Sequence, residues 1–311
     1  MNALQLFNYI AIAFFALVVL IKMIRIARMP IHLRWDLYPI PHEKGKGEYG
    51  GSYYEEIDWW TKPRDVSLFS ELKEMAKEII FVHSVYKNNR SLWIFSFPFH
   101  FGLYCLIGFL VLILIGALMG LSGNALSSES TGIGTFVYSL TNILGTAGWA
   151  LSIIGGTGLF LSRIFRNDLR GPSVMSDYVN LLFMLAFLIT GFIAGWMYDG
   201  GYVYLRSYAQ SLITFSPAGV MPPALETHLW ALGALLFYYP FTHMTHVFSK
   251  YFTYHKIRWE DSPNTRGSKI EKSIINALGY RVSWSASHIK AGSTWAEVAT
   301  TNPTEEKKDN G

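Results

Sequence analysis

The 311-residue sequence contains a single cysteine, Cys105, and few charged side chains. One cysteine excludes a disulfide within the chain, and it also excludes an iron–sulfur cluster or zinc site built from this chain's own thiolates. Charged residues make up 15% of the sequence and hydrophobic residues 51%, whereas soluble domains carry roughly a quarter charged residues. The net charge of +4 is modest, so we expect no nucleic-acid partner. These features indicate an integral membrane protein with soluble appendages.

Five apolar runs are long enough to cross a lipid bilayer, for which a helix needs roughly 20 residues. They cover residues 4–26, 97–121, 136–161, 178–198 and 225–252. Of the 26 Lys and Arg residues, 25 lie in residues 22–90, 163–170 and 250–311. The positive-inside rule then places the N-terminus outside and the C-terminus in the cytoplasm. We therefore expect an all-α, multi-pass protein of the cell inner (cytoplasmic) membrane with five transmembrane helices.

The remaining sequence divides around these runs. Residues 1–26 are predicted to be an uncleaved first transmembrane helix, because no basic segment precedes the apolar run as in a signal peptide. We expect residues 27–96 to form a cytoplasmic loop, residues 97–252 a four-helix membrane core, and residues 253–311 a cytoplasmic C-terminal segment. We expect Pro98 in the first turn of the second span, and a short outer cap with little sign of chemistry at residues 199–223.

Within the loop, residues 67–83 are predicted to form an amphipathic helix. Its apolar residues recur at intervals of three and four, with Lys and Glu between them: Leu68, Leu72, Met75, Ile79 and Val82. Such a helix lies on the membrane surface or packs against a partner.

The last span carries three histidines although it is apolar. We expect one helix from Glu226 to Phe252, on which His228 and His246 are 18 residues, or five turns, apart. Both would then point to the same side, about 27 Å apart along the axis, which is close to the thickness of the hydrocarbon core. His243 would lie about 60° around the helix from His246, where a propionate contact or a cytoplasmic-side hydrogen bond is expected rather than ligation.

His100 supplies a partner for His246. The two residues are expected at similar depth near the cytoplasmic ends of antiparallel helices, an arrangement that holds a haem iron from both faces. Packing with a hydrogen bond to a neighbouring helix is the plainer alternative, but a buried imidazole in a bilayer is costly and usually functional. We therefore predict that His100 and His246 are the iron ligands of a b-type haem.

Two short motifs resemble the gamma (cytochrome b) subunit of respiratory nitrate reductase. One is Phe-His-Phe-Gly at residues 99–102, and the other combines His228-Leu229, Phe-Tyr-Tyr-Pro-Phe at 237–241, and His246 followed by Val-Phe-Ser. Similar subunits occur in heterodisulfide-reductase-like and sulfite-reduction-associated membrane complexes, which the stretch 32–51 resembles more closely. The resemblance covers roughly residues 1–255 in architecture.

In the nitrate reductase pattern, four histidines hold two haems. The inner pair corresponds to His100 and His246, and the outer pair would need His228 and a histidine ten residues after His100. That position is Leu110, which cannot bind iron. One haem is therefore expected and a second is open. His228 has three interpretations: it binds an outer haem with another partner, it hydrogen-bonds a quinone, or it bonds a neighbouring helix.

These observations predict a cytochrome b subunit of an anaerobic-type respiratory complex. It would transfer electrons between membrane quinone and a cytoplasmic-side iron–sulfur partner, and it would anchor that partner. The main alternative is a transporter with proton-handling histidines. That class would pair histidines with acidic residues inside the spans, where Glu226 at a span edge is the only candidate, and it often carries inverted repeats, which are not evident. A structural anchor whose histidines only pack is the third interpretation.

Overall fold

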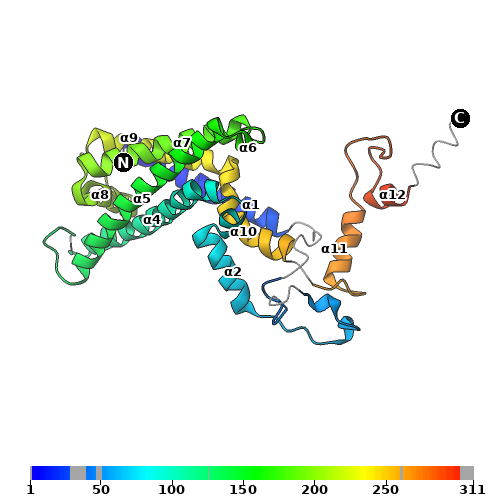
Figure 1. Ribbon diagram of the computed structural model, residues 1–311. Coiled ribbons are helices and arrows are strands. Elements are labelled where there is room, and N and C mark those ends of the chain that lie inside the picture. Colours follow the sequence, from blue (N-terminus) through cyan, green and yellow to red (C-terminus); the bar gives the residue numbers. More distant parts are fainter. Residues whose placement is uncertain (1, 29–39, 47–50, 125, 260–261, 302–311) are drawn as a thin grey trace. The chain divides into compact units, whose positions relative to one another are not determined.

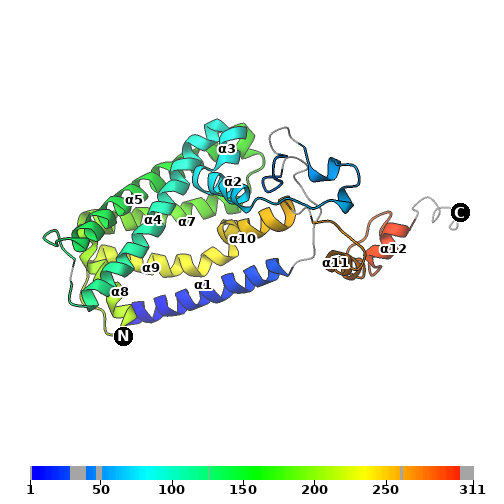
Figure 2. The ribbon, with the colours of Figure 1, turned by 90° about the horizontal axis from the view of Figure 1, so that it is seen from below.

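The computed structural model describes residues 2–28, 40–46, 51–124, 126–259 and 262–301 (Figures 1 and 2). Residues 29–39 and 47–50, which include most of the stretch 32–51, lie outside this description. The described residues form helices and turns with isolated β-bridges and no strand, so the all-α prediction is confirmed for them. Contacts divide the chain into two compact units, Met1–Leu20 with Glu71–Thr245, and Ile21–Ser70 with His246–Gly311.

Among the described residues, four helices are long and apolar enough to span a membrane. They are α1 (Ala3–Ala27), α4 (Arg90–Leu121), α5 (Ile133–Phe165) and α7 (Met175–Ile193), which continues through a π-helical turn to Tyr198. They match the first four predicted apolar runs and make this a multi-pass membrane protein. Helix α4 begins before its apolar run, so Pro98 lies inside the helix and the prediction that it stands in the first turn is wrong.

The fifth predicted span is not one continuous helix. Helix α9 (Pro223–Tyr238) is followed by two 3₁₀ turns, and α10 (His246–Thr253) begins only after them. Pro240 has no N–H to donate and its ring hinders an uninterrupted helix, while Thr242 is extended at φ −96° and ψ 163°. The prediction that His228 and His246 share one face of one helix is therefore wrong.

Glycines bring α4 and α5 into close contact. A Cβ on Gly102 would lie 2.5 Å from the backbone nitrogen of Ser152, and one on Gly155 would overlap the backbone of Phe99. Because backbone atoms cannot move aside as side chains can, only glycine permits this approach, as in other tightly packed membrane helices. The hydrophobic core beside this contact is formed by α4, α5 and α7 with the end of α9, and it includes Phe109, Trp149 and Leu188.

At one end of the bundle, α8 (Val203–Ile213) packs on α4 and bonds to α1. Gln5 Nε2 donates to Ser211 Oγ at 3.0 Å, and Asn8 Nδ2 donates to the Tyr208 hydroxyl at 2.8 Å. Helix α1 also lies along α9, where the ring of Phe7 contacts Trp230 with centroids 4.9 Å apart (Figure 2). The predicted short outer cap thus contains a helix that packs on α4 and is bonded to α1 through buried polar side chains.

Helices α2 (Leu68–Phe81) and α3 (His83–Asn88) precede the second span. The Tyr104 hydroxyl donates to the Ile79 carbonyl at 2.6 Å, and Trp93 Nε1 donates to the Phe81 carbonyl at 2.7 Å, so the end of α2 is attached to α4. Of the five apolar residues in the predicted stripe, Met75 and Val82 are buried and the other three are exposed.

The second unit contains short elements. Glu43, which is buried, accepts hydrogen bonds from the Ser52 hydroxyl and the Tyr53 N–H, at the start of the 3₁₀ turn Tyr53–Glu55, which a second turn at Trp59–Thr61 follows. The C-terminal segment forms α11 (Lys269–Leu278) and α12 (Trp295–Thr300), each capped at its N-terminus by a hydroxyl side chain.

Candidate functional site

His100 lies on α4 with its imidazole oriented by the preceding turn. Its Nδ1 is 2.7 Å from the carbonyl oxygen of Ser96, four residues earlier. A carbonyl oxygen only accepts, so Nδ1 carries the proton and donates it, and Nε2 is the nitrogen that keeps its lone pair. Metal-binding histidines commonly use this arrangement, because the second hydrogen bond fixes both the tautomer and the ring orientation. His100 therefore has the chemistry of an axial haem ligand.

His246, the predicted partner of His100, is an exposed residue at the start of α10. It belongs to the unit Ile21–Ser70 with His246–Gly311, whereas His100 belongs to the unit Met1–Leu20 with Glu71–Thr245. The pairing of these two histidines across one haem stays a prediction.

His228 lies on α9 and is 6% exposed. Its Nδ1 is 3.1 Å from the Thr190 hydroxyl of α7, and that hydroxyl donates its only proton to the Phe187 carbonyl at 2.9 Å. Thr190 must therefore accept from His228, which places the proton on Nδ1 and the lone pair on Nε2. The fold thus fixes the tautomer of His228 as it fixes that of His100, through a different kind of partner.

Two aromatic rings enclose the His228 imidazole. The ring of Phe187 lies 4.8 Å from it and that of Trp149 lies 5.5 Å from it, the latter edge-on at 85°. A glycine makes this packing possible, because a Cβ on Gly191 would overlap Trp149 and lie 2.8 Å from Cε1 of His228. His228 is consequently held in one position by α5 and α7.

Leu110, at the position where an outer haem ligand would be needed, is 55% exposed. Its neighbour Phe109 is buried and contacts Trp149 and Tyr202, with ring centroids 6.2 Å and 4.6 Å apart. A leucine side chain has no atom that binds iron. The residue of α4 that contacts Trp149 is Phe109, whose ring cannot bind iron either. These residues do not supply the two-histidine ligand set of an outer haem.

His243 is exposed and lies beside α7. Its Nδ1 is 3.3 Å from Asn180 Nδ2 and 3.7 Å from an Asp177 carboxylate oxygen, and Asn180 in turn accepts from the Tyr238 hydroxyl at 2.7 Å. Asn180 thus gives His243 a hydrogen-bond partner on α7, while the cytoplasmic-side position of His243 and the propionate alternative stay predictions.

One polar cluster was missed by sequence reasoning. Asp199 and Arg206 are 1% and 5% exposed, and the Asp199 carboxylate accepts from the N–H groups of Tyr204 and Leu205 at the start of α8. Burial raises the pKa of the Asp199 carboxyl, although these N–H groups and Arg206 act in the opposite direction. Arg206 is the single cation of residues 199–223, and that isolation is the signal that could have identified it.

The described helices define the class as a multi-pass, helical membrane protein with one oriented imidazole on the apolar helix α4 and another on α9. The chain belongs to the nitrate reductase gamma subunit family, whose model it matches over residues 83–260. The resemblance inferred from its two motifs is thereby confirmed.

A curated relative is 24% identical over 280 residues, which cover 79% of this chain and 76% of the relative. That protein is the "Hdr-like menaquinol oxidoreductase cytochrome b-like subunit" of Archaeoglobus fulgidus. The name of this relative agrees with the resemblance of the sequence to heterodisulfide-reductase-like subunits.

Proposed function

We propose that this chain is the cytochrome b subunit of a membrane-bound quinone oxidoreductase complex. The observation that carries the proposal is the hydrogen bond from His100 Nδ1 to the Ser96 carbonyl, which leaves Nε2 as the ligand nitrogen, on a chain of the nitrate reductase gamma subunit family. His100 and His246 hold a b-type haem, which supplies one-electron transfer. Their own contribution is to fix the position and basicity of the ligating nitrogens.

The quinone contact is His228. Oxidation of a quinol to a quinone releases two electrons and two protons, and an unprotonated imidazole nitrogen is a suitable acceptor for a quinol hydroxyl. The hydrogen bond from Nδ1 to Thr190 leaves Nε2 in that form. The absence of a ligand atom at Leu110 favours this role over a second haem, and the name of the archaeal relative favours menaquinol as the quinone class.

The partner is an iron–sulfur subunit on the cytoplasmic side. Lys and Arg are concentrated in residues 22–90, 163–170 and 250–311, which supports an inner-membrane orientation with these segments in the cytoplasm. The loop 27–96 and the segment 253–311 are the parts of the chain available for docking on that side. The chain thereby anchors its partner and transfers electrons to or from it.

Spectroscopy of the purified protein tests the proposal. A dithionite-reduced sample should give a b-type absorption band, and an oxidised menaquinone analogue should remove that band by reoxidation. A colourless protein after expression with adequate haem supply would contradict the cytochrome assignment. A band that no quinone reoxidises would contradict the quinone assignment alone.

A further inference from the structure

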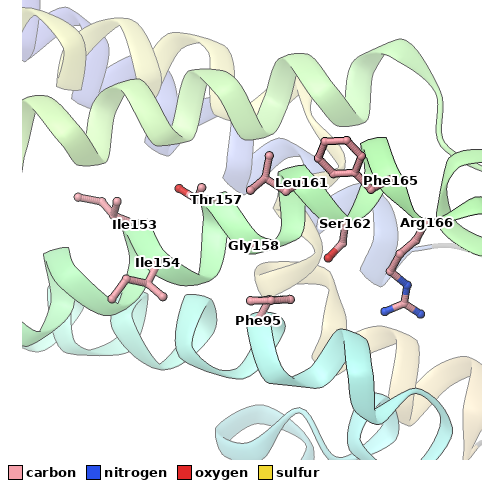
Figure 3. A pocket seen from close by; sticks show the side chains of 9 residues that line it. All are labelled: Phe95, Ile153, Ile154, Thr157, Gly158, Leu161, Ser162, Phe165 and Arg166. Carbon is pink, nitrogen blue, oxygen red and sulfur yellow. The ribbon is translucent and has the colours of Figure 1, made fainter.

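A groove in the bundle has no histidine among its lining residues. It has a volume of about 570 Å³ and is formed by Phe95 of α4 and by residues of α5 between Ile153 and Arg166 (Figure 3). That volume is within the roughly 300–1,000 Å³ of small-molecule sites in proteins. Ile154, Thr157 and Phe165 are exposed, so the groove opens on the outer surface of two membrane-spanning helices.

Glycine forms the floor of this groove. Gly158 lies directly beneath the Phe95 ring, and a Cβ at that position would overlap it. The two helices are therefore close at their backbones, while the larger side chains on either side form the walls. Along the groove the lining residues are hydrophobic apart from Thr157, Ser162 and Arg166, and this composition suits a hydrocarbon chain better than a polar ring that needs hydrogen-bond donors.

The dimensions of the groove match one leaflet of a bilayer. Ile153 and Arg166 are 13 residues apart, which corresponds to about 20 Å along a helix. Half of a typical hydrocarbon core is about 15 Å. An acyl chain lying against Ile153 and Ile154 would thus have its headgroup at the level of Arg166, at the end of α5 (Figure 3).

The end of the groove at Arg166 is cationic. Arg163 and Arg166 belong to the end of α5 and its cap, Arg170 ends α6 (Asn167–Arg170), and Arg90 is adjacent to Asn89, which accepts from Arg166 Nη2 at 3.4 Å. The Asp168 carboxylate accepts two hydrogen bonds from Arg166, one from Nε at 3.1 Å and one from Nη2 at 2.7 Å. An exposed ion pair of this kind is weak in water, so a phosphate can share the guanidinium.

We propose that this groove binds an anionic phospholipid, with an acyl chain between α4 and α5 and its phosphate at Arg166. Basic pockets at the cytoplasmic ends of membrane helices recognise acidic headgroups, and each cation near the surface contributes about 1 kcal/mol. The phospholipid would hold the ends of α4 and α5 together at the level where the cytoplasmic segments begin.

Native mass spectrometry of the full chain tests the site. The protein is purified in mild detergent and offered phosphatidylglycerol or phosphatidylcholine with the same acyl chains. The wild type should retain phosphatidylglycerol in preference to phosphatidylcholine. Thr157→Trp should remove most of the retention by filling the groove, while Ile143→Trp, on an exposed position of the same helix outside the groove, should leave it unchanged.

A second pair of variants tests the headgroup contact. Arg166→Gln should lower the affinity for phosphatidylglycerol about fivefold, the equivalent of one cation, whereas Asp168→Asn removes the ion pair but keeps the cation and should not lower it. Thermal unfolding checks that each variant is folded. Equal retention of both lipids, unchanged retention in Thr157→Trp and Arg166→Gln, or a co-purifying quinone displaced by Thr157→Trp would overturn the proposal.

Discussion

The Nδ1 of His228 on α9 donates a hydrogen bond to the Thr190 hydroxyl on α7 at 3.1 Å, and the Thr190 hydroxyl donates a hydrogen bond to the Phe187 carbonyl. This pair links a predicted functional side chain to a span that has no ionisable group between residues 178 and 198. The hydroxyl of Thr190 thus determines that Nε2 is the nitrogen of His228 that can accept a hydrogen bond or bind a ligand.

Thr190→Val should destabilise the protein and impair quinol reactivity. Valine has nearly the shape of threonine but accepts no hydrogen bond, so the His228 N–H loses its partner at a cost of about 1–2 kcal/mol. Denaturation in micelles measures the loss, and Thr190→Ser, which keeps the hydroxyl, is the matched control. If Thr190→Val matches the wild type in both stability and quinol turnover, the hydrogen bond has no role.

Gly191→Ala should be destabilising although the change is a single methyl group. The new Cβ would overlap Trp149 and lie 2.8 Å from His228 Cε1, and such overpacking costs about 1–3 kcal/mol. Gly200→Ala is the control, because no other atom lies within 4 Å of the corresponding Cβ. Thermal unfolding of both variants should separate them, and an equal effect of the two substitutions would contradict the packing around His228.

The buried carboxyl of Asp199 should make stability depend on pH. Burial raises its pKa above the ordinary value, so the fold favours the protonated form. Its contribution is fully present below the unfolded-state pKa of about 3.9 and is lost as pH rises through the folded-state pKa. In Asp199→Asn that loss is absent.

The melting temperature of Asp199→Asn relative to the wild type should therefore increase from acidic to neutral pH. Arg206 lowers the pKa of Asp199. Repeating the comparison between Asp199→Asn and its parent protein in an Arg206→Gln background therefore reports how far the guanidinium offsets the buried charge. A difference between Asp199→Asn and the wild type that stays constant with pH would show that Asp199 does not titrate in this range.

Much of the architecture could be predicted from residue patterns. Apolar length predicted the four long helices of the described residues. The close contact between α4 and α5 at Gly102 and Gly155 is a finding of the structure. The interruption of the last span had a visible signal in Pro240, which favours a break, but the apolar character on both sides of it suggested one helix. Composition measures whether a segment suits the bilayer and says little about whether its backbone is continuous.

The surroundings of the candidate site could not be predicted in this way. His100 and Ser96 are four residues apart, so their contact follows from helical geometry. Thr190 and His228 are 38 residues apart, and their contact depends on how α7 packs against α9. The burial of Arg206 likewise depends on how α8 packs on α4. Local spacing determines the first kind of contact, and tertiary packing determines the others.

The number of haems per polypeptide, measured in the wild type and in single histidine variants, tests the central claim most directly. One b-type haem per chain is expected, lost in His100→Ala and in His246→Ala and retained in His228→Ala, with quinol oxidation impaired in the last variant. Retention of the full haem content in His100→Ala, or two haems per chain of which one disappears in His228→Ala, would contradict the account.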